Sequence, residues 1–150
     1  MQSAHPLTPI MRPEKMSRGA LVLLSLSASL AMAQTPAALQ SAWTQMARSQ
    51  DAGYAPSATR GRALYERSFH NNSELSSCTS CHTHNPTQPG RHIITSKVIA
   101  PLSPSSNPQR FTDTAKSEKW FKRNCNDVMG RECTPAEKAD LLEFLLRGGT

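Results

Sequence analysis

The amino-acid sequence predicts a small all-α domain with about four helices around one site. Apolar residues recur at spacings near three and four in several segments, which is typical of amphipathic helices. Thr134, Pro135 and Glu137 match the N-cap, N1 and N3 positions of a capping box, so a helix should begin there. A C-x-x-C-H motif at residues 78–82 lacks a surrounding β-α-β pattern, which favours a short helical turn.

The motif at residues 78–82 is typical of the covalent attachment of a c-type haem. Residues three apart share one face of a helical turn, so Cys78 and Cys81 can present their sulfur atoms to two vinyl groups of one porphyrin edge. His82 follows where an imidazole nitrogen acts as the proximal iron ligand. A zinc half-site and a thiol–disulfide centre are the alternatives, but no second C-x-x-C is present to complete a zinc site.

The first 33 residues have the pattern of a secretory signal peptide with a preceding extension. Lys15 and Arg18 precede an apolar run at residues 19–30, and Ala33 completes a small-x-small cleavage site. The run has 12 residues and is too short for a membrane span, which needs roughly 20. We therefore expect export to the periplasm, with Gln34 as the first mature residue.

The mature chain is expected to contain one haem domain. We assign residues 34–59 to an N-terminal helical extension, 60–147 to the cytochrome c domain and 148–150 to a tail. Fourteen basic and ten acidic residues remain after signal removal, so the formal net charge is +4. This positive charge suits a redox partner with an acidic docking surface. Arginine repeats with interleaved aromatic residues, which would indicate nucleic-acid binding, are missing from the sequence.

Cys125 and Cys133 remain once the haem motif is assigned. An oxidising compartment favours a disulfide between them. Closing this nine-residue loop would stabilise the fold by roughly 2 to 3 kcal/mol in the chain-entropy account.

Two helices are expected before the haem motif, at residues 36–49 and from about residue 58 to 69. In the second, Gly61 is followed by Leu64 and Tyr65 at i+3 and i+4, so one small and two bulky residues share a face. Because glycine lets another helix approach closely, we expect the C-terminal helix to cross there.

Residues 85–109 contain five prolines, so a regular helix or sheet is not expected in this segment. The composition also fits a disordered segment. Apolar pairs such as Ile93-Ile94 favour an ordered loop that lines the porphyrin. A backbone carbonyl near Pro101 is expected to accept a hydrogen bond from the imidazole nitrogen of His82 that faces away from the iron.

A third helix is expected at residues 112–123, capped by Thr112 or Asp113. Its basic stripe consists of Lys116, Lys119 and Arg123 and is expected to face solvent, with contact to a partner or a haem propionate as the alternative. The fourth helix follows Thr134 and ends at Gly148-Gly149. Its buried face consists of Leu141, Leu142, Leu145 and Leu146.

The ligand on the side of the iron opposite His82 decides whether that coordination position is permanently occupied or open to a small molecule. From ligand chemistry alone Met129 is the first candidate, since thioether ligation raises the potential of an electron carrier. We expect it in the loop before the last helix, where a flexible gap-filler is an equally good role for methionine. His70, His84 and His92 are weaker rivals, because His84 is too close to the proximal motif and the other two are typical of surface histidines.

Several separated stretches resemble the SHP family of monohaem cytochromes c, named from the sphaeroides haem protein. They are residues 78–82, 86–92, 100–102, 107–113, 118–125 and 130–134. Their shared order makes the resemblance specific, and it covers roughly residues 60–146. It implies a fold similar to class I cytochrome c, with a few α-helices around one covalently attached haem.

The resemblance also implies roles for single residues. His82 is the proximal ligand, Asn124 replaces Met129 as the distal ligand, and Cys125 forms a disulfide with Cys133 near the haem. In this family the asparagine is a weak ligand that leaves on reduction and opens ferrous iron to oxygen or nitric oxide. This chemistry is coherent, since an amide oxygen is a hard ligand that suits ferric iron better than ferrous iron.

We therefore expect an exported monohaem cytochrome c that exchanges electrons with a dihaem or membrane cytochrome and binds oxygen, nitric oxide or a similar small ligand. A plain electron carrier with His82/Met129 ligation is the alternative. An acid–base pair beside Asn124 is not evident, although Arg123 or Asp127 can contribute. The sequence thus favours electron transfer or ligand binding over a dedicated enzyme.

Overall fold

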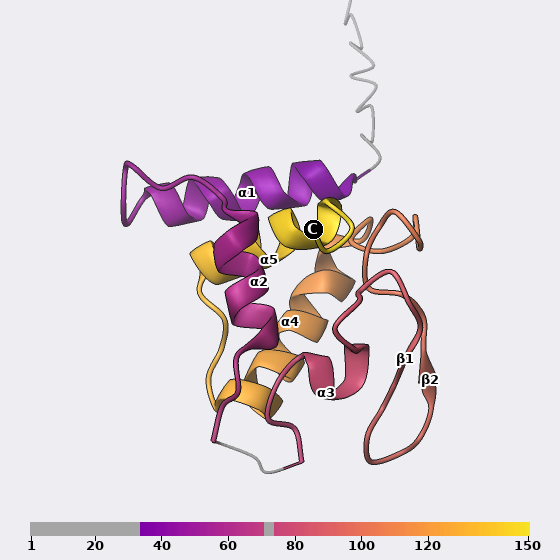
Figure 1. Ribbon diagram of the computed structural model, residues 1–150. Helices are drawn as coiled ribbons and strands as arrows, with labels where there is room; N and C mark the ends of the chain where they lie inside the picture. Colours follow the sequence, from indigo (N-terminus) through magenta and orange to yellow (C-terminus); the bar gives the residue numbers. More distant parts are fainter. Residues whose placement is uncertain (1–33, 71–73) are drawn as a thin grey trace, which may run out of the picture. The chain divides into compact units, whose positions relative to one another are not determined.

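The computed structural model describes residues 34–70 and 74–150, so the expected signal peptide at residues 1–33 lies outside the described residues. The main helices in this part are α1 (Pro36–Arg48), α2 (Ala58–Glu66), α4 (Thr114–Met129) and α5 (Pro135–Leu146) (Figure 1). The smaller elements are the single turn α3 (Thr79–His82) and the strands β1 (Gly90–Arg91) and β2 (Val98–Ile99). The prediction of about four helices is confirmed, with α3 as an additional turn.

Helix α5 begins at the predicted capping box. The Thr134 hydroxyl accepts from the backbone N–H of Glu137 at 3.2 Å, and the Glu137 carboxylate accepts from the N–H of Thr134 at 2.8 Å. Two backbone donors are thereby satisfied at the N-terminus, with Pro135 in the first turn. The predicted buried face is largely confirmed, since Leu141, Leu142 and Leu145 are buried and Leu146 is half-buried.

Helices α2 and α5 cross at Gly61, as the sequence predicts. A Cβ atom at Gly61 would lie 2.0 Å from the carbonyl oxygen of Asp140, so a side chain cannot be accommodated at this distance. One turn further along α2, Tyr65 is fully buried and its ring lies 5.4 Å from that of Phe144. The crossing therefore holds Tyr65 in the interior of the domain, where its ring packs against α5.

Helix α1 packs against α5 and shares the main hydrophobic core. Trp43 is 1% exposed, contacts Phe121 edge-on at 4.9 Å between ring centroids, and donates to Glu118 at 2.5 Å. Glu118 also accepts from Lys138 of α5 at 2.5 Å. Trp43 and this ion pair therefore join α1 to both α4 and α5.

Helix α4 is longer than the predicted segment at residues 112–123. Its N-cap is Asp113, which accepts from the N–H of Lys116 at 2.9 Å, and it ends at Gly130 in the left-handed conformation (φ 73°). Glycine and proline are absent from residues 114–129, and its buried residues continue at helical spacing past residue 123. The expectation that Met129 lies in a loop is therefore wrong, because Met129 is the last helical residue.

The proline-rich segment at residues 85–109 is ordered, and its strands are short. Pro86 is buried, and its carbonyl oxygen accepts from the N–H groups of both Leu102 and Ser103 at 2.9 Å. The expectation of no sheet is wrong at one place, where β1 pairs antiparallel with β2. Both strands lie within residues 90–100, which contain no proline, so their backbone donors remain available. Within the described ranges, every helix is too short or too polar to cross a membrane.

Candidate haem site

The C-x-x-C-H motif forms α3 and the residue before it. Cys78 occupies the N-cap, and the N–H of His82 donates to its carbonyl oxygen at 3.1 Å. Cys78 and Cys81 are both half-buried free thiols that line the same cavity. Burial raises the pKa of the Cys78 thiol to about 11, so it is protonated at neutral pH. The turn therefore presents two thiols to one space, as haem attachment requires.

The cavity beside α3 has a volume of about 630 Å³. This lies within the usual range for cofactor sites, about 300 to 1,000 Å³. Helices α2, α4 and α5 and the segment at residues 92–111 all contribute to its walls. Apolar members of the lining include Leu64, Ile99, Leu102, Phe111, Phe121 and Leu141. The size and the apolar walls suit a large flat macrocycle.

His82 has the protonation state that a metal ligand needs. Burial, with a smaller contribution from the positive charge of Arg110, lowers the pKa of His82 to about 4, so the imidazole is neutral at physiological pH. A neutral imidazole has a free lone pair for a metal. Its Nδ1 atom is buried without a hydrogen-bond partner among the described residues. These residues therefore fit a haem bound beside α3.

The expected hydrogen bond between His82 and Pro101 is not formed. The carbonyl oxygen of Pro101 instead accepts from the Asn107 side chain at 3.2 Å and from the Arg110 guanidinium at 3.0 Å. Arg110 also donates to the carbonyl oxygen of Ala100 at 2.8 Å. This arrangement was missed from sequence, although Asn107 and Arg110 lie in one of the stretches that carry the family resemblance. It brings a cation into the cavity wall near His82.

Helix α4 supplies the wall that contains both candidate distal ligands. Asn124 and Met129 line the cavity. Met129 is half-buried and packs against the hydrophobic core, whereas Asn124 is exposed. Within residues 34–70 and 74–150, the side-chain amide of Asn124 makes no hydrogen bond. Of the two side chains, that of Asn124 is therefore the more exposed and is not held by a hydrogen bond to another described residue.

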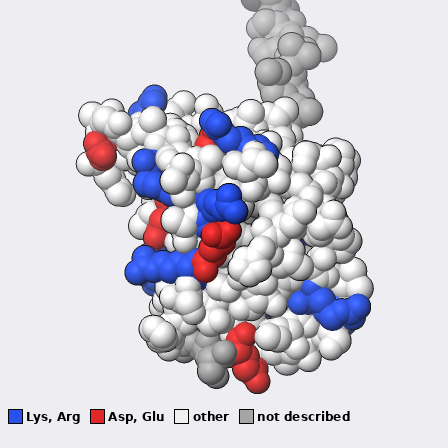
Figure 2. All heavy atoms as spheres, viewed as in Figure 1, with Lys and Arg blue, Asp and Glu red and all other residues white. Residues whose placement is uncertain are grey.

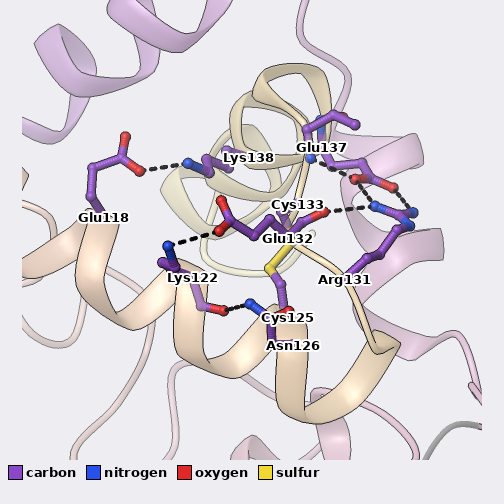
Figure 3. Close-up of a disulfide and its surroundings, with 10 residues drawn as sticks. Glu118, Lys122, Cys125, Asn126, Arg131, Glu132, Cys133, Glu137 and Lys138 are labelled. Carbon is purple, nitrogen blue, oxygen red and sulfur yellow. Dashed lines mark hydrogen bonds and ion pairs between the residues drawn. A yellow bond between two sulfur atoms is a disulfide. The ribbon is translucent and has the colours of Figure 1, made fainter.

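The structure joins Cys125 to Cys133 in a disulfide that links α4 to the residue before the Thr134 cap (Figure 3). Both cysteines are buried and line the cavity. Figure 3 shows the ion pair between Lys122 and Glu132 beside this link, with a separation of 3.0 Å. The disulfide follows Asn124 directly, so it restrains the backbone that carries this side chain.

The remaining candidates lie at the edge of the cavity or outside it. His92 is half-buried at the cavity wall, where its Nδ1 accepts from the N–H groups of Ile94 and Thr95 at 3.3 Å. His70 and His84 are exposed and do not contribute to the lining. The structure thus brings Cys78, Cys81, His82, Asn124, Met129, Cys125 and Cys133 together around one cavity.

Two residues considered for acid–base chemistry interact with each other. Arg123 and Asp127 both line the cavity and form an ion pair across one turn of α4 at 3.6 Å. The guanidinium of Arg123 also lies 5.6 Å from the centre of the Trp120 ring. Their charges are therefore compensated at the rim.

Comparisons with known proteins agree with this geometry. The family model described as a domain of unknown function (DUF1924) matches residues 51–145. Cytochrome c'' of Methylophilus methylotrophus is 43% identical over 106 residues, which cover 69% of this chain and 74% of the relative. The cytochrome c-type protein SHP of Cereibacter sphaeroides is 52% identical over 95 residues, or 63% of this chain and 73% of the relative. The chain belongs to the DUF1924 family and is a homologue of SHP and cytochrome c''.

Solved structures of these homologues have the same fold. Oxidised SHP is 46% identical and aligns with a TM-score of 0.68 over 75% of this chain and 96% of that structure. Oxidised cytochrome c'' is 39% identical, with a TM-score of 0.70 over 77% of this chain and 95% of that structure. The predicted SHP-like cytochrome fold and the expectation of haem c are therefore confirmed. The roles of individual residues remain predictions.

Proposed function

We propose that this DUF1924 protein is a periplasmic monohaem cytochrome c that transfers electrons and binds a small ligand such as oxygen or nitric oxide. Cys78 and Cys81 hold the haem by thioether bonds, His82 is the proximal ligand and Asn124 is the weak distal ligand. The haem supplies a one-electron couple and a coordination position. Asn124 would supply an amide oxygen at that position, a hard donor that suits ferric iron better than ferrous iron. Its displacement would leave the position to a small molecule.

One observation supports this proposal most strongly. The side chain of Asn124 borders the same cavity as His82 and forms no hydrogen bond within the described residues. Its movement therefore breaks no hydrogen bond to another described residue. The homologues support the same behaviour, since the SHP structure is described as that of an oxygen-binding cytochrome c and a solution structure of cytochrome c'' concerns haem-ligand detachment.

A redox partner with an acidic surface suits the mouth of the cavity. Lys97 and Lys116 are exposed there, and neither forms an ion pair with another described residue. Val98 and Trp120, which are 66% and 43% exposed, add apolar surface. Figure 2 shows mixed acidic and basic side chains over the helices, whereas the side with β1 and β2 carries a basic cluster in a largely uncharged surface. A dihaem cytochrome c or a membrane cytochrome with an acidic docking face would complement this mouth.

The distal assignment is tested by Asn124→Ala and Met129→Ala in protein matured with covalent haem. If Asn124 is the ligand, only Asn124→Ala should change the ferric spin state, and it should also change the ligand-binding rates. Visible spectra in both redox states, with and without carbon monoxide, measure this. Met129→Ala is the matched control, because it shortens a side chain on the same helix and the same cavity wall.

The alternative of a closed electron carrier has one observation in its favour, since Met129 also lines the cavity. It predicts a methionine–iron charge-transfer band in the ferric protein, a low-spin spectrum in both states and no carbon monoxide binding. If Met129→Ala alone abolished that band, the open-site proposal would be wrong.

A further inference from the structure

We propose that Tyr65 is a positioning residue for the proximal ligand, because its hydroxyl holds the carbonyl end of the turn that carries His82. The phenol oxygen lies 2.7 Å from the carbonyl oxygen of Thr83 and 3.2 Å from that of His82. Among the described residues it is the only side chain outside α3 that donates to these two carbonyls. This inference rests on the proposed role of His82 as proximal ligand.

The phenol is held rigidly where it makes these bonds. Tyr65 is 0% exposed, and its ring contacts Phe144 of α5 one turn after the tight crossing at Gly61. Burial raises the pKa of Tyr65, so the hydroxyl keeps its proton and donates at any physiological pH. Helices α2 and α5, which lie far apart in the sequence, thus fix the donor.

The turn that receives these bonds has little support of its own. α3 is four residues long, and the last carbonyl groups of a helix lack intrahelical donors. Thr83 has a φ of 61°, which is unusual for a β-branched residue, so the chain turns sharply directly after His82. Gly90 packs closely against the same turn, where a Cβ atom would lie 2.1 Å from the carbonyl oxygen of Cys81. Tyr65 and Gly90 therefore both contact the end of α3.

The imidazole of His82 forms no hydrogen bond at Nδ1 with the described residues, which increases the importance of the backbone that carries it. Ligating histidines usually donate their second ring nitrogen to a carbonyl or carboxylate, which fixes the orientation of the ring. Here Nδ1 of His82 has no partner in the described part of the chain, and the Pro101 carbonyl is taken by Asn107 and Arg110. The orientation of the ring must then depend on how firmly the His82–Thr83 peptide is held.

The test compares Tyr65→Phe with Tyr54→Phe in full-length, haem-loaded protein. Tyr54 is the matched control, since it is also buried and donates to Ala136 and Asp140, but it does not line the cavity. Tyr65→Phe should lower and broaden the iron–histidine stretching band in the resonance Raman spectrum of the reduced protein. It should also favour ferrous over ferric iron about two- to tenfold, a rise of about 20 to 60 mV at 59 mV per tenfold for one electron. Tyr54→Phe should reduce thermal stability and leave both haem measurements unchanged.

A second variant keeps the ring and changes only the hydrogen bond. The chain has two tyrosines, so fluorotyrosine incorporated into Tyr54→Phe protein labels Tyr65 alone. The more acidic phenol is a stronger donor and should shift the stretching band and the potential in the direction opposite to Tyr65→Phe. Potentials equal in wild type, Tyr65→Phe and the fluorinated protein would overturn the positioning role.

The same measurements separate this inference from the proposed function. Absence of an iron–histidine band in reduced wild-type protein would contradict an open ferrous site, and the potentials alone would then decide the role of Tyr65. A normal band in wild type with no response to either Tyr65 change would reject only the positioning role. An alkaline pyridine haemochrome spectrum of each variant verifies that the haem is attached by two thioethers.

Discussion

Replacing Gly61 with alanine tests the helix crossing on which the cavity depends. The new Cβ atom would lie 2.0 Å from the Asp140 carbonyl oxygen, 2.6 Å from its carbon and 3.0 Å from the nitrogen of Leu141. Contacts become ordinary near 3.4 Å, so α2 and α5 must separate by about 1.4 Å, the difference between 3.4 and 2.0 Å. All three atoms are backbone and cannot rotate away.

Two effects of this change have opposite signs. Alanine is the better helix former by about 1 kcal/mol, which alone would stabilise α2. Overpacking costs typically 1 to 3 kcal/mol, and a backbone clash belongs at the upper end. We therefore expect a net loss of about 2 kcal/mol, or a fall in Tm of about 8 °C at roughly 4 °C per kcal/mol.

The assay is thermal unfolding of the oxidised protein, followed by circular dichroism and by Soret absorbance. Gly53→Ala is the control, because its Cβ atom would meet only the Asp51 side chain at an ordinary 3.4 Å and its φ is not left-handed. An unchanged or higher Tm in Gly61→Ala would refute the reasoning, since helix propensity would then outweigh the contact.

Three further predictions concern the disulfide, the last helix and the partner surface. Replacing both Cys125 and Cys133 with serine should lower the free energy of unfolding, measured by denaturant titration, by about 2 to 3 kcal/mol. It should also alter the rates of carbon monoxide binding. Unchanged rates would contradict a link between this disulfide and Asn124. Arg131 donates to Glu137 and holds the pKa of that carboxyl below 4.5, against the effect of burial and with help from the Thr134 N–H. Because the pKa of Glu137 is depressed in the folded state, this stabilisation is present above about pH 4.5 and is lost as the pH falls through the folded pKa. The difference in unfolding free energy between wild type and Glu137→Gln should therefore shrink in that pH window. A difference that stays constant with pH would disprove the coupling. Changing Lys97 and Lys116 to glutamate should slow reduction by an acidic dihaem donor about tenfold at low salt without altering the spectrum, whereas Arg62→Glu, outside the cavity, should not; equal effects would argue against this docking surface.

Features that depend on local chemistry could be predicted from the sequence. The capping box at Thr134, the haem motif and the helix face shared by Gly61, Leu64 and Tyr65 each involve residues within about one helical turn. Their physics is local, because neighbours three or four positions apart meet on one helix face whatever the rest of the chain does. Helix α4 extends beyond the predicted end at residue 123, because its buried residues keep helical spacing and no helix breaker occurs before Gly130.

Features that depend on contacts between distant segments could not be predicted. The bonds from Tyr65 to the His82–Thr83 turn join residues 17 and 18 positions apart, and no spacing rule connects them. The predicted hydrogen bond from His82 to the Pro101 carbonyl is not formed, because the donors to that carbonyl are Asn107 and Arg110. The sequence indicates that a carbonyl in this segment accepts a hydrogen bond. It does not show which of several nearby donors forms that bond in the folded chain.

Under the proposed function, the position of Asn124 explains why a distal ligand on α4 can be both precisely placed and weakly held. Its backbone lies inside a helix that continues for five more residues, and the next residue is tied to Cys133 by the disulfide. Its side chain is exposed and makes no hydrogen bond within the described residues. Under the proposed function, release of the ligand then needs only rotation of a short side chain, because the helix is held at both ends by the Asp113 and Gly130 caps. A rotation of this kind costs far less than unwinding a helical turn, so a small difference in affinity between ferric and ferrous iron is enough to open the site.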